Sequence, residues 1–341
     1  MTEKTREFVG LDCGTYHAIS ARKNGDQLDF KKEINAFFTV PIENDFMLNM
    51  LKNSGAPIVE IGDEAYVLGE NAVDLALSMN KEYQRPMRNG ILSVNEKNSF
   101  SILAVILRSI IGPLTADETI VYYSVPGDVV GSADSNVAYH TKVIQSILDK
   151  YKDGDKIVQA VAINEAQAVA YAELQGNQLS GCVIDFGGGL VNVCYMLFGV
   201  PIFKFSIMNS GDWIDEQSSK HCGETIAFMN QQKHNNLDLS REPSSSIERS
   251  LVYHYQLMIE HALNQVILGI KAAGTKANPG KPIPIILVGG TASPKFFLEF
   301  FQKTLEKMQF PIAISEIKLA KNHLFSVAKG CYAAAAVMHK N

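Results

Sequence analysis

Two aspartates that each end a short apolar run are the residues best placed to do chemistry. Asp12 ends the run within residues 8–15 (FVGLDCGT), and Asp185 ends the run within residues 182–189 (CVIDFGGG). In both copies glycine follows within two residues, so the backbone can approach a phosphate and donate N–H groups to its oxygens. Two such units half a chain apart predict two related lobes that hold a polyphosphate between them.

The two aspartates have a predicted metal role as well. A buried carboxylate without a partner is costly. A hydrated Mg²⁺ that bridges to phosphates offsets this cost, because Mg²⁺ keeps several waters and takes few protein ligands. Asp12 and Asp185 are therefore predicted to hold Mg²⁺ through water. The alternative is that each aspartate caps nearby backbone N–H groups.

Two further segments have the residue types of a nucleotide site. Gly289, Gly290 and Thr291 follow an apolar strand and precede a helix, and such a turn can admit a flat ring or a sugar against the backbone. Glu165 stands where a strand gives way to a helix, so it could orient a water toward a phosphate. The alternatives are a plain strand-to-helix connection and a glutamate favoured by the helix dipole.

These residues must be positioned by strands and helices, and the hydrophobic pattern predicts both. Strands are predicted at 8–12, 18–23, 27–34, 57–61, 65–68, 119–125, 157–163, 182–186, 191–198, 202–208 and 285–288. Helices are predicted from residue 99 to before 112, and at 135–151, 164–174, 212–221, 224–232, 245–273, 296–307 and 324–338. Each half of the chain shows a triplet of strands that alternates with helices. This repeated pattern predicts a duplicated α/β fold.

The composition excludes several classes of protein. The chain has 341 residues and a net charge of -5, and its sequence holds no basic block of the kind that binds nucleic acid. Its five cysteines show no CxxC spacing, which argues against a disulfide framework or a zinc site and favours a reducing cytoplasm. A polar N-terminus and the lack of an apolar run of roughly 20 residues predict no membrane anchor.

Five motifs in order resemble those of the actin/Hsp70/sugar-kinase superfamily of nucleotide-binding proteins. They are the first phosphate motif at 9–15, a connecting motif at 163–168, the second phosphate motif at 183–189, the adenosine motif at 286–291 and a second connecting motif at 327–331. The resemblance implies a two-lobed actin-like ATPase fold, with duplicated ribonuclease-H-like domains around a nucleotide cleft. It implies ATP or ADP and Mg²⁺ as ligands.

Within the superfamily, residues 210–216 and 223–225 resemble prokaryotic actins of the MreB, MamK and archaeal-actin type. The implied first lobe is 1–163, with an inserted subdomain at about 31–95 and a closing C-terminal helix at 324–341; the second lobe is 164–323. Self-association into cytoplasmic filaments, with accessory proteins, is implied. The implied catalytic residues are Glu165, Asp12 and Asp185, and the implied nucleotide-binding residues are Gly14, Thr15, Tyr16, Gly187, Gly188, Gly189, Glu224, Gly289, Gly290 and Thr291.

The chain also departs from the family pattern. Leu190 and Asn192 stand where the family usually has a hydroxyl residue and an acid, which makes nucleotide binding a safer prediction than fast hydrolysis. The lysine that eukaryotic actin carries after its first phosphate motif is absent, since the chain reads Tyr16-His17-Ala18. Two alternatives stay open: a non-filamentous chaperone-like or reactivase-type switch, and small-molecule phosphotransfer.

Overall fold

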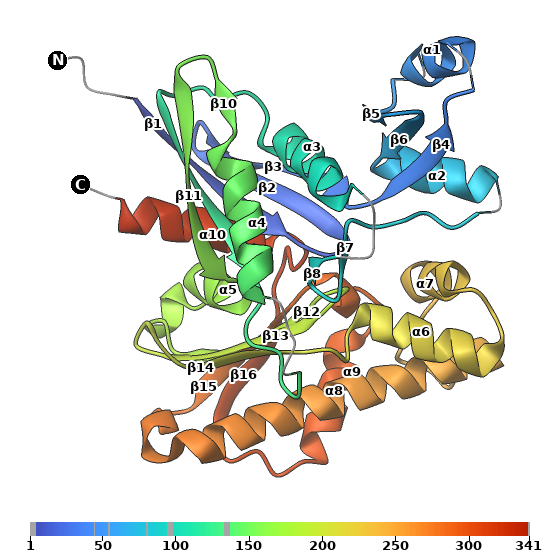
Figure 1. Cartoon of the computed structure of the whole chain (residues 1–341). Coiled ribbons are helices and arrows are strands. Elements are labelled where there is room, and N and C mark those ends of the chain that lie inside the picture. Colours follow the sequence, from blue (N-terminus) through green and yellow to red (C-terminus); the bar gives the residue numbers. More distant parts are fainter. Residues whose placement is uncertain are drawn as a thin grey trace.

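The computed structural model describes residues 5–43, 45–53, 55–79, 81–93, 98–132 and 137–339. Within them the chain forms two α/β lobes, each built on one main sheet (Figure 1). The first sheet has the order β10-β11-β9-β1-β2-β3, and the second has the order β14-β13-β12-β15-β16. The duplicated α/β fold class predicted from the sequence is confirmed.

The first sheet opens with the predicted meander. Strands β1 and β2 pair antiparallel, as do β2 and β3, while β9 runs parallel to both β1 and β11. Gly25 in the turn between β2 and β3 has a φ of 60°, the conformation that this turn chemistry predicts. The strands are β1 (Arg6–Cys13), β2 (His17–Asn24), β3 (Gln27–Ile34), β9 (Glu118–Val125), β10 (Lys152–Asp153) and β11 (Lys156–Asn164).

The second sheet repeats this plan. Strands β12 and β13 form an antiparallel hairpin, β14 extends it, and β15 runs parallel to β12 on the other side. The edge strand β16 (Ile314–Leu319) was not predicted, although its mixture of apolar and polar residues is typical of a half-exposed strand. The other strands are β12 (Gly181–Phe186), β13 (Val191–Leu197), β14 (Val200–Ile207) and β15 (Ile283–Val288).

A small subdomain is inserted after β3. Its sheet β4-β6-β5 consists of β4 (Phe37–Pro41), β5 (Ile58–Ile61) and β6 (Glu64–Leu68), with helices α1 (Asp45–Asn53) and α2 (Glu70–Ser78). The predicted 57–68 hairpin is present, whereas α2 was missed. After α2 the chain returns through a two-stranded hairpin, β7 (Met87–Arg88) and β8 (Ile91–Leu92).

Helices cover both sheets, and two of them lie between the lobes. Helices α5 (Glu165–Glu173) and α10 (Ser326–Met338) pack on each other and share one buried cluster with strands of both sheets. The remaining helices are α3 (Ser99–Ile111), α4 (Val137–Asp149), α6 (Gly211–Cys222), α7 (Ile226–Asn235), α8 (Ser246–Ala273) and α9 (Phe297–Glu306). The predicted start of α4 at 135 lies outside the described residues, as do residues 340 and 341 of the predicted C-terminal helix.

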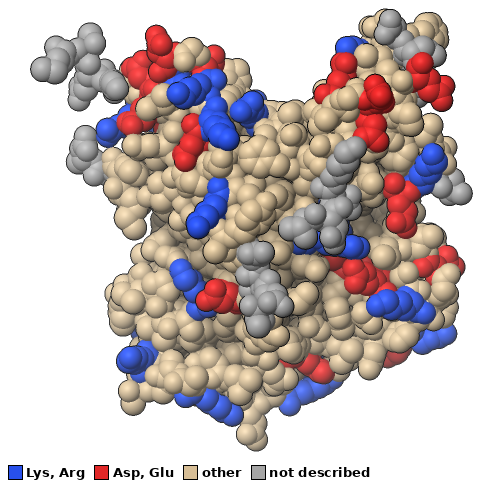
Figure 2. Space-filling view, viewed as in Figure 1, with Lys and Arg blue, Asp and Glu red and all other residues tan. Residues whose placement is uncertain are grey.

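Each lobe has its own hydrophobic core, one on each side of the shared α5–α10 cluster. The lobe boundaries at 163 and 323 stay a prediction. Acidic and basic side chains are interspersed on the face shown in Figure 2. In the described part of the chain, no helix has the length and apolar character needed to cross a membrane.

Candidate functional site

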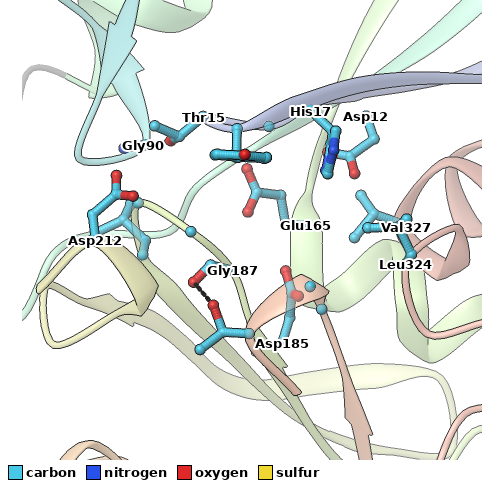
Figure 3. Close-up of a pocket in the computed structure, with 18 of the residues that line it drawn as sticks. Asp12, Thr15, His17, Gly90, Glu165, Asp185, Gly187, Asp212, Leu324 and Val327 are labelled. Carbon is cyan, nitrogen blue, oxygen red and sulfur yellow. Dashed lines mark hydrogen bonds between the residues drawn. The ribbon is translucent and has the colours of Figure 1, made fainter. Parts of the chain in front are cut away.

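The predicted site residues line one cleft between the lobes (Figure 3). The cleft brings together every predicted catalytic and nucleotide-binding residue except Glu224: Asp12, Gly14, Thr15, Tyr16, Glu165, Asp185, Gly187, Gly188, Gly189, Gly289, Gly290 and Thr291. The two motifs in which an aspartate is followed by glycine two residues later therefore face the same space. This is the arrangement that a ligand held between two lobes requires.

The two loops that carry the predicted phosphate motifs, called the phosphate loops below, lie against each other across the cleft. The first loop joins β1 to β2, and the second joins β12 to β13. A Cβ atom added to Gly189 would lie 2.3 Å from Thr15 Oγ1, so a side chain there would collide with the first loop. Thr15 Oγ1 also accepts a hydrogen bond of 2.9 Å from the backbone N–H of Gly90, in the β7–β8 hairpin. Gly90 was not predicted, because nothing local in its hairpin signals a cleft residue.

Three carboxylates form the chemical centre of the cleft, with Asp185 buried and Asp12 and Glu165 half-buried. Burial and then the charge of Asp185 raise the pKa of Asp12 to about 8, although Ser124 donates a 3.2 Å hydrogen bond to Asp12 Oδ1. Burial raises the pKa of Asp185 to about 6. Burial, and then the charges of Asp185 and Asp12, raise the pKa of Glu165 well above its usual range. Such a cluster lacks positive charge, so the donor set fits a cation.

Asn192 connects two of these carboxylates. Its side-chain Nδ2 donates to Glu165 Oε2 and lies 3.5 Å from Asp185 Oδ2. Its Oδ1 accepts from the hydroxyl of Ser206 at 2.5 Å, and Ser206 Oγ in turn accepts from the N–H of Gly127 at 2.8 Å. Sequence reasoning treated Asn192 as a lost acid and missed this role. The signal is the strand register, in which Asn192 lies directly opposite Asp185.

The adenosine motif follows β15 as predicted, but it opens a short 3₁₀ turn over Gly290–Ala292 instead of the helix. Gly289 has a φ of 96°, which other residues rarely adopt, and an added Cβ would lie 2.5 Å from Asp185 Oδ1. The hydroxyl of Thr291 donates to the carbonyl of Gly187 at 2.9 Å. The adenosine motif is therefore hydrogen-bonded directly to the second phosphate loop.

The structure places Glu224 away from the cleft. It is exposed between α6 and α7, and its carbonyl accepts a hydrogen bond from Ser219 Oγ. The cleft is lined instead by Asn230, Lys233 and His234 of α7. These three residues lie at i, i+3 and i+4 and so share one face of the helix. This spacing is visible in the sequence and could have indicated that they face the same site.

The charges of the α7 residues are largely neutralised. Lys233 is 2% exposed, and its Nζ donates to Asp215 Oδ2 at 2.6 Å and to the carbonyl of Gly211 at 2.9 Å. Burial, followed by nearby Lys233, lowers the pKa of His234 to about 4. Burial likewise lowers the pKa of His17, on the other wall of the cleft, to about 4. Both histidines are therefore neutral near pH 7.

Solved structures share this architecture. The chain matches a subunit of the MamK double helical filament with a TM-score of 0.72 and 15% identity, covering 97% of this chain and 99% of that one. MreB5 of Spiroplasma citri bound to AMPPNP matches with a TM-score of 0.65 and 14% identity, covering 96% and 95%. The ethanolamine utilization protein EutJ of Carboxydothermus hydrogenoformans matches with a TM-score of 0.52 and 15% identity, covering 95% and 88%.

The fold is the two-lobed actin-like fold of the MamK and MreB5 structures. Among the curated proteins, none matches this sequence. The sequence matches the Volactin family over residues 8–335, which is nearly the whole chain, and the protein therefore belongs to the Volactin family.

Proposed function

We propose that this protein binds ATP and Mg²⁺ in the cleft, hydrolyses ATP slowly and assembles into cytoplasmic filaments. The observation that carries the proposal is the convergence of two phosphate loops on three carboxylates, Asp12, Glu165 and Asp185, in one cleft. Two solved relatives add support, since a MamK mutant and MreB5 are each bound to AMPPNP. The backbone of Gly14, Thr15 and Gly187–Gly189 would donate to the phosphates.

Asp12 and Asp185 would hold the ion through its water molecules. Within the described residues no three His, Cys, Asp or Glu side chains are grouped to bind a metal directly. The proposed ion is one that keeps its own waters and needs few protein ligands. Bound there, Mg²⁺ would neutralise charge that develops on the transferred phosphoryl group. A cation fits this position because Asp12 and Asp185 line the same cleft and it would offset the cost of placing their charges out of water.

Glu165 would orient the attacking water. The water oxygen attacks the terminal phosphorus, the bond to the bridging oxygen of ADP breaks, and the proton of the water leaves with the products. Asn192 donates to Glu165 Oε2 and so fixes which carboxylate oxygen remains free for the water. Slow turnover is expected because Leu190 places an apolar side chain where the family has a hydroxyl, and Asn192 cannot accept a proton.

Assembly into filaments rests on the likeness to MamK, whose solved structure is a double helical filament. The test is sedimentation and negative-stain electron microscopy of the purified protein with ATP and Mg²⁺, with ADP as the comparison. Filaments that need ATP support the proposal. Protein that stays monomeric across salt and crowding conditions, yet binds nucleotide, supports the chaperone-like switch instead. ATP turnover that rises sharply with one metabolite supports phosphotransfer.

A further inference from the structure

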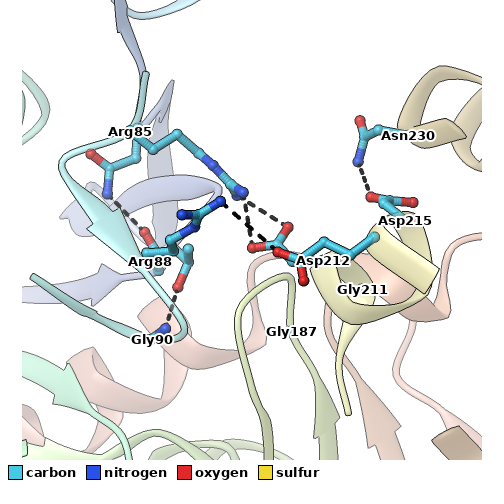
Figure 4. A network of polar contacts seen from close by, with 12 residues as sticks. Arg85, Arg88, Gly90, Gly187, Gly211, Asp212, Asp215 and Asn230 are labelled. Atoms are coloured by element: carbon cyan, nitrogen blue, oxygen red, sulfur yellow. Dashed lines mark hydrogen bonds and ion pairs between the residues drawn. The ribbon is translucent and has the colours of Figure 1, made fainter. Parts of the chain in front are cut away.

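Arg85 has no role in the function described so far. It lies between α2 and β7 and contacts α6 of the second lobe (Figure 4). It lines a neighbouring pocket that shares Tyr16 and Asp212 with the cleft. Its Nη1 donates to Asp212 Oδ1 at 3.1 Å, and its Nη2 lies 3.0 Å from Asp212 Oδ2. The two side chains are 20% and 11% exposed. This is a paired, largely desolvated contact between residues of different lobes.

The partner of Arg85 is part of the wall that faces the phosphate loops. The backbone N–H of Asp212 donates to the carbonyl of Gly188 at 2.7 Å. A Cβ atom on Gly188 would lie 3.9 Å from Asp212 Oδ1 and 3.3 Å from Tyr16 Cβ. The guanidinium carbon of Arg85 lies 5.9 Å from the centroid of the Tyr16 ring. The guanidinium therefore lies beside Tyr16 of the first phosphate loop and is linked to Gly188 of the second through Asp212.

The cleft is short of available positive charge. Its described lining includes four carboxylates: Asp12, Glu165, Asp185 and Asp212. Lys233 is the lysine in that described lining, and it is already bound to Asp215 and to the carbonyl of Gly211. A nucleoside triphosphate and its metal add more negative than positive charge. A further cation is therefore needed at the phosphate end.

We propose that Arg85 is a ligand of the terminal phosphate, held on Asp212 until a nucleoside triphosphate arrives. The inference rests on the proposed ATP-binding function. A guanidinium presents the same two parallel N–H groups to a carboxylate and to a phosphate, so Asp212 occupies the place of the phosphate oxygens. Asp212 remains stabilised after the exchange, because it lies in the first turn of α6, where the helix dipole favours negative charge.

Two variants with opposite expected effects test the proposal. The measurements are dissociation constants of AMPPNP and ADP, each with Mg²⁺, by calorimetry. Arg85→Gln should weaken AMPPNP binding roughly tenfold or more and leave ADP within roughly threefold, because the lost bonds are charge-assisted and reach only the terminal phosphate. Asp212→Asn should bind AMPPNP as tightly as the wild type or more tightly, because it releases Arg85.

Two more variants act as controls. Arg88→Gln removes an exposed arginine that lies 4.0 Å from Glu216 on the same two segments, and it should change neither constant. Arg85→Lys keeps the positive charge but lacks the two parallel N–H groups of the guanidinium, so it should lose part of the AMPPNP affinity. The melting temperature without nucleotide will show whether Arg85→Gln folds. If it folds poorly, AMPPNP and ADP affinities can still be compared in Arg85→Lys.

The outcomes separate this inference from the function on which it rests. Equal loss of AMPPNP and ADP affinity in Arg85→Gln, or the same loss in Asp212→Asn, overturns the inference and leaves Arg85 as an inter-lobe contact. In that case nucleotide binding by the wild type still supports the proposed function. A wild-type protein that binds neither nucleotide overturns both.

Discussion

The side-chain amide of Asn192 donates a hydrogen bond to the carboxylate of Glu165. Glu165 begins α5, whereas Asn192 lies on β13 of the second sheet. The bond therefore links the residue proposed to orient water to the sheet that carries the second phosphate loop. A neutral amide also suits this place, because the neighbouring carboxylates Asp12 and Asp185 already have raised pKa values.

Asn192→Asp tests whether the missing acid limits hydrolysis. A carboxylate at position 192 would repel Glu165 and Asp185 and would lose the donor that orients Glu165. We expect phosphate release to slow by roughly tenfold or more, as for loss of an aligned catalytic group. The melting temperature of the nucleotide-free variant should fall more at pH 8 than at pH 6. Faster phosphate release would instead show that the lack of an acid at position 192 limits hydrolysis.

Glu165→Ala separates chemistry from binding. If Glu165 orients the water, its removal should lower turnover by roughly a hundredfold while the AMPPNP dissociation constant stays within roughly threefold. Single-turnover phosphate release and calorimetry measure the two effects. Glu173→Ala is a matched control, because Glu173 lies at the other end of α5 and pairs with Lys329 at 2.9 Å, away from the cleft lining. Normal turnover in Glu165→Ala would remove Glu165 from the mechanism.

Asp12→Asn tests the metal role through two effects of opposite sign. The variant keeps an oxygen that can accept from Ser124 but removes a half-buried charge. Without nucleotide, its melting temperature at pH 8.5 should equal or exceed that of the wild type, since repulsion with Asp185 is relieved. Its AMPPNP affinity should no longer respond to Mg²⁺, whereas chelation of Mg²⁺ should weaken binding to the wild type. A variant that keeps the full response to Mg²⁺ places the metal elsewhere.

The features that the sequence predicts well are local ones. The glycine loops, the adjacent strands and the strand–helix junction at Glu165 each depend on residues that are neighbours in the chain. The missed features join distant segments. Arg85 and Asp212 are 127 residues apart, and Gly90 and Thr15 are 75 apart, so no periodicity or motif signals these contacts. Glu224, which a resemblance located, does not line the cleft, and its nucleotide-binding role stays a prediction. The helical phase of α7 decides which residues of that helix face the cleft.

Acid should destabilise the protein in part through His140, a residue remote from the proposed metal site. His140 lies on α4 and is 1% exposed, and its Nδ1 accepts a 3.1 Å hydrogen bond from the backbone N–H of Leu92. The bond holds the β7–β8 hairpin, whose Gly90 donates to Thr15 in the first phosphate loop. A proton on Nδ1 would abolish this acceptor, so the neutral ring is required.

The direction in which pH changes stability follows from the pKa of His140 in the folded and in the unfolded protein. Burial lowers the pKa of His140 to about 4 in the folded protein, against 6.5 as the ordinary value. Between these pH values the unfolded chain binds the proton and the folded chain does not, so the free energy of unfolding falls as the pH drops below about 6.5. The full contribution is on the order of 3 kcal/mol, reached near pH 4.

His140→Asn isolates this contribution. The Asn oxygen can take the place of Nδ1 as acceptor but cannot be protonated in this range. Urea unfolding of the variant should give a weaker loss of stability between pH 6.5 and pH 4.5 than the wild type shows. His17 and His234 are unchanged in both proteins, so their share of the acid effect cancels in the comparison. Identical pH profiles for the two proteins would show that His140 is not protonated on unfolding or that the folded protein accepts its charge.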